Sequence, residues 1–259
     1  MARSRRATRL PAPFLKRLTL IEERMDRSAY PMTLPWLDPE FALGFEQPVT
    51  IIVGENGSGK STLIEAIAAL AGYDQAGGGK GYRTVDHSTA IEASGAGLAD
   101  ALRAGWLPRV TEGWFFRAES FFAVARGLDQ AAREAEETPP DYLSWSHGEG
   151  FVRIFEERMT RQGLYLMDEP ESALSPDRQR ALLCLLARIQ ESAVSQVILA
   201  THSPILMAVP GAQVLEITRF GLAEVDYRAT RHFELYRAFV TDPQGFVAEA
   251  LADHRAEAG

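Results

Sequence analysis

A run of glycine, lysine and hydroxyl residues at Gly54 to Thr62 has the composition and spacing of a phosphate-binding loop. It reads Gly-Glu-Asn-Gly-Ser-Gly-Lys-Ser-Thr and matches the pattern GxxxxGK[ST]. Its glycines let the backbone curl so that successive N–H groups point at one anion. Lys60 would reach the β- and γ-phosphates of a nucleoside triphosphate, and the Ser61 hydroxyl would ligate Mg²⁺. The residues expected to contact the nucleotide are Gly54, Asn56, Gly57, Ser58, Gly59, Lys60, Ser61 and Thr62.

The flanking segments are those that such a loop needs. The β-branched run from Val49 to Val53 predicts a strand before it, and Leu63 to Ala71 predicts a helix after it. That helix would add its N-terminal dipole and its free N–H donors to the anion site. The loop therefore occurs in the strand–loop–helix context that makes the motif specific.

A second motif places two carboxylates at the end of an apolar strand. Leu164 to Met167 predicts a buried strand, and Asp168 and Glu169 follow it directly, before Pro170. Asp168 would hold Mg²⁺, directly or through water. Glu169 would polarise the water that attacks the γ-phosphate.

A third motif ends another strand in a histidine. Val197 to Ala200 predicts a buried strand, and Thr201-His202-Ser203 follows it. The His202 imidazole would donate to the γ-phosphate or orient the attacking water. The predicted catalytic residues are thus Glu169, His202 and Lys60, and the predicted metal ligands are Ser61 and Asp168.

The order of these motifs resembles the nucleotide-binding fold of ABC-type ATPases. Ser146-His147-Gly148-Glu149 is similar to the signature of that family, and Ser-Ala-Leu follows the Asp-Glu pair as it does there. The resemblance covers roughly residues 14–227 and is greatest to compact stand-alone bacterial ATPases often labelled AAA family. It implies ATP and Mg²⁺ as ligands, hydrolysis of ATP, and a homodimer that encloses two ATP molecules. By that analogy Ser146, Gly148 and Glu149 of one copy cap the γ-phosphate held by the other.

The sequence departs from the family pattern at two places. Trp145 and His147 stand where the signature has leucine and glycine, and residues 113–120 lack the glutamine that usually reaches Mg²⁺. Arg117 would substitute toward phosphate, or Glu119 toward metal or water. A core strand followed by a surface turn is the structural alternative for this stretch.

Strands that alternate with helices predict an α/β fold with a mostly parallel sheet covered on both faces. The resemblance adds an antiparallel β portion and a small helical subdomain. We expect a basic tail over residues 1–13 and one ATPase domain over 14–259, with an insert at about 72–162. Strands are expected at Phe14–Arg24, 49–53, 114–118, 164–167, 197–200, 214–217 and 222–227, and helices at 63–71, Leu98–Ala104, 120–126, 148–161, 176–190 and on both sides of Asp242-Pro243.

Composition and charge limit the binding partners and the cellular location that fit this chain. The 259 residues carry a formal net charge of -8, although the first 17 hold six basic residues and no acid. The rest of the chain is therefore strongly acidic, and this acidity argues against broad nonspecific binding of nucleic acid. No apolar run approaches the ~18 residues of a membrane span. The single cysteine, Cys184, lies in an apolar run and is expected in the core. These features favour a cytoplasmic protein.

Three functions fit these motifs. The first is a soluble ATPase whose ATP-bound dimer opens and closes as a clamp, alone or with an unidentified protein partner. The second is a DNA-repair or defence ATPase that acts with a nuclease or a DNA-binding partner. The third is the ATP-hydrolysing subunit of a membrane transporter, which the missing glutamine disfavours.

Tyr30 is a candidate for contact with the adenine.

Overall fold

The structure is a computed structural model that describes residues 10–74, 77–80, 94–110, 112–118, 132–133 and 147–257. Its main sheet has the strand order β5-β6-β7-β3-β8-β9. Every neighbouring pair in it is parallel except the β8–β9 hairpin. In chain order these strands are β3 (Val49–Gly54), β5 (Gly113–Arg117), β6 (Leu164–Asp168), β7 (Gln196–Ala200), β8 (Gln213–Thr218) and β9 (Gly221–Glu224).

A second, antiparallel sheet contains the first two strands of the chain. It has the order β2-β1-β4 and consists of β1 (Leu15–Leu20), β2 (Ala42–Gly44) and β4 (Leu102–Trp106). The side chain of Gln196, at the start of β7, links the segment that enters β1 to the main sheet. Its Oε1 accepts from the backbone N–H groups of Phe14 and Leu15, both at 2.8 Å.

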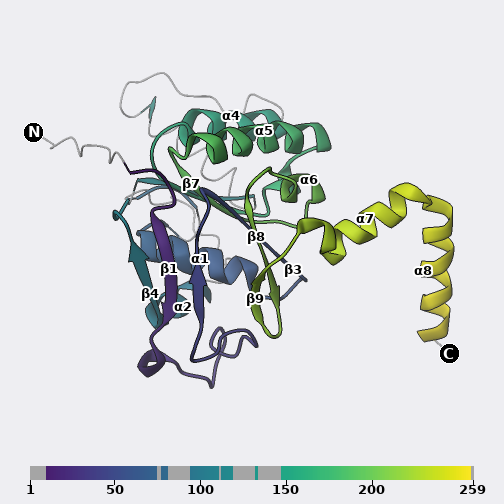
Figure 1. Ribbon diagram of the computed structural model, residues 1–259, viewed down its shortest axis with the longest axis horizontal. Coiled ribbons are helices and arrows are strands. Elements are labelled where there is room, and N and C mark those ends of the chain that lie inside the picture. The colour runs from purple at the N-terminus through teal and green to yellow at the C-terminus, as the bar shows by residue number, and fades with distance from the viewer. Residues whose placement is uncertain are drawn as a thin grey trace, which may run out of the picture.

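Helices cover both faces of the main sheet (Figure 1). The α-helices are α1 (Lys60–Ala71), α2 (Ser94–Ala101), α4 (His147–Met159), α5 (Pro176–Ser192), α6 (Pro204–Met207), α7 (Arg231–Thr241) and α8 (Pro243–Glu257), and short 3-10 turns occur at η1 (Glu22–Arg24), η2 (Pro170–Ala173) and η3 (Tyr227–Ala229). Helices α1 and α2 lie on one side with the antiparallel sheet, and α4 and α5 lie on the other. Helices α7 and α8 project from the body as an arm that ends at the C-terminus (Figure 1).

Two hydrophobic cores lie on the two faces of the sheet. Alternate side chains of β3 enter them: Ile52 packs with α1 and the antiparallel sheet, whereas Ile51 and Val53 pack with α4, α5 and α6. All six residues of β3 are buried. A strand with both faces covered is apolar throughout, which explains why the β-branched run before the phosphate loop has no polar alternation.

The predicted fold class is confirmed, as are most of the predicted elements. Residues 98–104 are an exception, because the helix ends at Ala101 and the chain continues as β4. Cys184 is exposed rather than in the core: α5 turns Leu182, Leu185, Leu186 and Ile189 inward, and Cys184 lies on another side of the helix. The helix expected at 120–126 lies outside the described residues, and the domain limits remain predictions.

Candidate active site

The register of the sheet brings the three sequence motifs to one edge. Asp168 at the end of β6 pairs with Ala200 of β7, and Ala200 pairs in turn with Ile52 of β3. On the other side Asp168 pairs with Arg117 at the end of β5. Because parallel strands end at the same edge, the residues that follow β3, β6 and β7 meet there. This is the position at which open α/β sheets bind ligands.

The phosphate loop connects β3 to α1 through left-handed glycine conformations. Gly57 has a φ of 75° and Gly59, the N-cap of α1, has a φ of 93°. A Cβ on Gly59 would lie 2.9 Å from a methyl carbon of Leu34. The indole N–H of the buried Trp36 donates to the Ser58 carbonyl at 2.7 Å. These contacts hold the loop curled at the start of the helix, as phosphate binding requires.

Lys60 lies inside this loop with 4 % of its surface exposed. Its ammonium group donates to the carbonyl oxygens of Gly54 at 2.9 Å and Glu55 at 3.1 Å. Burial lowers the pKa of Lys60, against the opposing influence of the carboxylates of Glu169 and Asp168. Phosphate oxygens bound here as predicted would replace these two carbonyl acceptors.

Ser61 and Asp168 form the predicted metal pair. The Ser61 hydroxyl donates to Asp168 Oδ1 at 3.0 Å. Burial raises the pKa of Asp168 to about 6 despite the neighbouring Arg117. The described residues contain no group of three or more His, Cys, Asp or Glu side chains that would hold a metal alone. Mg²⁺ at nucleotide sites takes one or two protein oxygens plus phosphates and water, so this pair fits Mg²⁺ bound together with ATP.

Arg117 lies on the other side of Asp168, in a buried set of charges. Its guanidinium donates to Glu65 Oε1 at 2.9 Å and is 3.8 Å from Asp168 Oδ2. The second oxygen of Glu65 accepts from the backbone N–H of Gly95 at 3.0 Å. Arg117 therefore ties α1 to β5, to β6 and, through Glu65, to α2. Glu119, the other candidate for the missing glutamine, lies outside the described residues.

Arg117→Met is expected to destabilise the fold by about 3 kcal/mol, because it leaves the buried Glu65 carboxylate without its guanidinium. Arg188→Met is the matched control: Arg188 is exposed and 3.8 Å from the exposed Glu156, and such pairs contribute about 0.5 kcal/mol. Urea unfolding of both variants measures the difference. Equal losses would show that the buried charges do not stabilise the fold.

Glu169 adopts an unusual backbone conformation. Its φ of 46° and ψ of 54° are left-handed, which among described non-glycine residues occurs only here and at Ala193. Such strain concentrates at functional sites. The backbone N–H of Glu169 donates to Ala200 at 3.0 Å, and Oε1 is 3.3 Å from His202 Nε2. The His202 contact lowers the pKa of Glu169, so the carboxylate is ionised at neutral pH.

Contacts around His202 hold its backbone and the turn that follows. Glu171 Oε1 accepts from the backbone N–H of His202, and burial raises the pKa of Glu171. In the next residue, the Ser203 hydroxyl donates to Gln179 Oε1 at 2.6 Å and accepts from Leu206 at 3.3 Å. These contacts hold the His202 imidazole beside Glu169.

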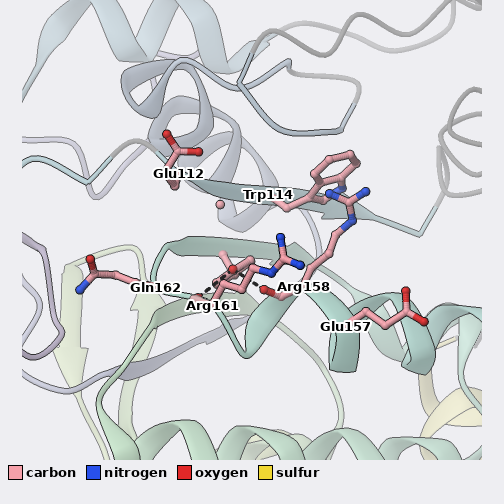
Figure 2. A pocket seen from close by; sticks show the side chains of 8 residues that line it. Glu112, Trp114, Glu157, Arg158, Arg161 and Gln162 are labelled. Carbon is pink, nitrogen blue, oxygen red and sulfur yellow. Dashed lines mark hydrogen bonds between the residues drawn. The ribbon is translucent and has the colours of Figure 1, made fainter. Parts of the chain in front are cut away.

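A cavity of about 230 Å³ lies at the meeting point of these residues. Its lining includes Ser61, Arg117, Asp168, Glu169 and Ser172. A larger hollow of about 410 Å³ lies at the opposite, amino-terminal end of β5 and β6. Figure 2 shows the Arg158 guanidinium over the Trp114 ring in that second hollow, 3.9 Å from the ring centroid. Only the first cavity adjoins the phosphate loop.

The remaining predicted residues are placed as follows. Asn56 is exposed on the loop, and Thr62 is buried, with its hydroxyl hydrogen-bonded to the hydroxyl of Tyr30. Tyr30 is 54 % exposed and thus accessible to a ligand. Gly148 and Glu149 lie in the first turn of α4. Ser146 lies outside the described residues.

Sequence reasoning missed three residues that the fold brings to the site. Glu65 follows the loop by one helical turn, but nothing in the sequence shows that it meets Arg117. Glu171 lies in the Asp-Glu-Pro-Glu run, where its acidic neighbours are the only signal. His232 is an isolated histidine, and its ring nitrogen lies 2.8 Å from His202.

Comparisons with known proteins match the two parts of the chain that carry the motifs. Residues 36–101 match a family model described as "AAA domain", and residues 150–208 match one described as "AAA domain, putative AbiEii toxin, Type IV TA system". The first match contains the phosphate loop, and the second contains Asp168, Glu169 and His202. The thiamine import ATP-binding protein ThiQ of Cereibacter sphaeroides is 29% identical over 175 residues, covering 59% of this chain and 70% of ThiQ.

Two solved structures are similar at greater distance. The SMC head domain from Thermotoga maritima has a TM-score of 0.43 and 16% identity over 82% of this chain and 98% of its own. The cbiO1 protein from Clostridium perfringens, part of the ABC transporter complex cbiONQ, has a TM-score of 0.42 and 16% identity over 82% of this chain and 91% of its own.

The phosphate loop, the strand order and the sequence matches define the class: this chain has a P-loop nucleotide-binding fold similar to that of ABC-type ATPases. Within the described residues, no helix has both the length and the apolar character that a membrane crossing requires.

Proposed function

We propose that the chain hydrolyses ATP to ADP and phosphate with Mg²⁺, and that two copies enclose two ATP molecules. The observation that carries this proposal is the shared sheet edge, where Ser61, Asp168 and Glu169 line one cavity. Lys60 lies in the phosphate loop, and His202 is 3.3 Å from Glu169. Each residue type suits one requirement of phosphoryl transfer, which depends on positioning and charge stabilisation.

The phosphate loop and Lys60 bind the triphosphate, with Lys60 moving from its two carbonyl acceptors to the β- and γ-phosphates. Ser58 Oγ is buried and has no hydrogen-bond partner among the described residues, which suits a phosphate oxygen as its partner. Mg²⁺, held by Ser61 and Asp168, would neutralise charge on the β- and γ-phosphates. The curled loop and the start of α1 fix the direction of the triphosphate in the cavity.

Glu169 acts on the water. The water oxygen forms a bond to the γ-phosphorus while the bond from that phosphorus to the bridging oxygen breaks, and ADP leaves. Glu169 accepts the proton that the water loses. His202, 3.3 Å from Glu169, orients the water or donates to the γ-phosphate, where negative charge accumulates.

The dimer supplies the second half of the site. Helix α4 begins at His147, so the signature precedes and opens a helix N-terminus, which favours a phosphate. We assign Ser146, Gly148 and Glu149 to the γ-phosphate held by the partner copy. Closure on ATP and opening after hydrolysis would then work as a clamp.

Mixing two inactive variants tests the shared site. Ser146→Arg blocks the signature and Lys60→Ala disables the phosphate loop, so both sites are defective in each homodimer. A mixed dimer has one site that combines the intact loop of one copy with the intact signature of the other. We expect up to about a quarter of wild-type phosphate release in an equal mixture, because half of the dimers then carry one good site of two. No recovery, with mixed dimers shown to form, would contradict the shared site.

A transporter subunit is the second candidate, because ThiQ, by its name, serves thiamine import. On this alternative the same ATP chemistry acts on a separate membrane protein. Purification from detergent-extracted cells distinguishes the two: a membrane partner at equal stoichiometry favours transport, and the chain alone favours the independent ATPase.

A further inference from the structure

The catalytic histidine contacts a second histidine that none of the motifs contains. His202 Nδ1 and His232 Nε2 are 2.8 Å apart, and the ring centroids are 4.8 Å apart at an interplanar angle of 53°. His202 Nε2 points the other way and lies 3.3 Å from Glu169 Oε1. His202 therefore lies between Glu169, the base of the proposed reaction, and His232 of α7, and contacts one of them with each ring nitrogen.

The local structure fixes His232 at the start of α7. Thr230 is the N-cap: its hydroxyl accepts from the backbone N–H of Phe233 at 3.3 Å and donates to the Tyr227 carbonyl at 2.6 Å. Thr230 is fully buried, and the ring of Phe233 packs edge-on against Tyr227 at 5.3 Å. The first turn of α7 thus has a defined position on the body, and His232 is held there with it.

Hydrogen-bond roles along this line follow from the chemistry of imidazole. A neutral imidazole has one N–H donor and one acceptor nitrogen, whereas a carboxylate only accepts. His202 Nε2 is buried 3.3 Å from Glu169 Oε1, although it makes no hydrogen bond to a described residue. A ring hydrogen on Nε2 faces that carboxyl oxygen more favourably than a lone pair would, which leaves His202 Nδ1 as the acceptor. The group that can donate to it is the Nε2–H of His232. Burial lowers the pKa of His232, as does the neighbouring His202, which favours a neutral His232 ring with one N–H to donate.

We propose that His232 is a positioning residue, which donates from its Nε2–H to His202 Nδ1 and so holds His202 in the Nε2–H tautomer. This proposal rests on the proposed hydrolysis, since it states how the ring of His202 is prepared for that reaction. The other tautomer would direct a lone pair at the Glu169 carboxylate and at the incoming γ-phosphate. Fixing the ring before ATP binds avoids a reorientation during the reaction.

The test compares four variants. His232→Leu removes the hydrogen bond at similar volume, His232→Gln keeps an N–H donor, and His232→Glu offers only an acceptor when ionised. His254→Leu is the control, because His254 is exposed in the last turn of α8. Thermal unfolding of each variant checks that the fold is retained.

The first measurement needs no nucleotide. Long-range ¹H–¹⁵N spectra of protein labelled at histidine nitrogen report the tautomer of each ring, and His202→Gln assigns the His202 signals. We expect the Nε2–H pattern for His202 in the wild type, in His232→Gln and in His254→Leu. His232→Leu should give averaged nitrogen shifts, and His232→Glu should place hydrogens on both ring nitrogens of His202, because a carboxylate then faces each of them. An unchanged His202 pattern in both of these variants would overturn the proposal.

The second measurement separates kcat from KM. We expect His232→Leu to lower kcat about tenfold with KM for ATP changed less than about twofold, and His232→Gln to recover most of that loss. A His232→Gln variant as slow as His232→Leu would contradict the positioning role. Absence of ATP hydrolysis by the wild-type protein would instead contradict the proposed function, while the spectra of the ligand-free protein would still decide whether His232 holds the ring.

Discussion

Glu169→Gln is expected to bind ATP normally and to lower kcat by about 10²- to 10⁴-fold, the contribution typical of a positioned general base. Glutamine has nearly the same shape but cannot accept the proton of the attacking water. Because ATP would bind and persist, the variant should accumulate as an ATP-bound dimer. Phosphate release measures the first effect, and size-exclusion chromatography with and without ATP measures the second.

The control for this variant is Glu191→Gln, which makes the same change at an exposed position of α5. It should retain wild-type kcat and remain in the wild-type oligomeric state. Wild-type turnover in Glu169→Gln would remove Glu169 as the base. Slow turnover without a dimer peak would keep the base but argue against the ATP-enclosing dimer.

Lys60→Ala should abolish most nucleotide binding. The Lys60 ammonium is buried within the loop on two carbonyl oxygens, so alanine removes the one side-chain charge that the loop directs at the phosphates. A loss of about 10²- to 10³-fold in kcat/KM is expected, as for removal of one preorganised donor to a developing oxyanion. Lys60→Arg should not restore it, because the planar guanidinium needs more room than the ammonium.

Calorimetric titration with a non-hydrolysable ATP analogue separates binding from turnover in these variants. Lys16→Ala, at an exposed position of β1, is the control and should bind as the wild type does. If Lys60→Ala bound the analogue with wild-type affinity, the loop would not be the nucleotide site. If it bound normally but turned over slowly, Lys60 would act on the transition state alone.

The two strongest motifs were predictable because each depends on residues that are close together in the chain. A curled glycine loop followed by Lys60 and Ser61 depends on neighbours in the chain, and an apolar strand that ends in Asp168 and Glu169 depends on its own burial. The parallel sheet then follows from strands that alternate with helices. Its register, with Asp168 level with Ala200 and Ala200 level with Ile52, brings both motifs to one edge.

Long-range contacts were not predictable in the same way. β4 follows a helix without a break because Leu102 to Trp106 pair with β1, 82 to 91 residues earlier in the chain. Cys184 has apolar neighbours along the chain, yet the rotation of α5 on the sheet leaves it exposed. Neither outcome is visible without knowing which surfaces the elements pack against.

The amino-acid sequence by itself therefore determined the chemistry that we propose for this protein: a triphosphate loop, an acidic pair predicted to serve metal and water, and a strand-end histidine. Only the tertiary structure decided how that chemistry is supported. Glu65 meets Arg117, Glu171 holds the backbone of His202, and His232 reaches its ring. The physical reason is that a motif is specified by bonded neighbours, whereas its supporting contacts are specified by how separate elements pack.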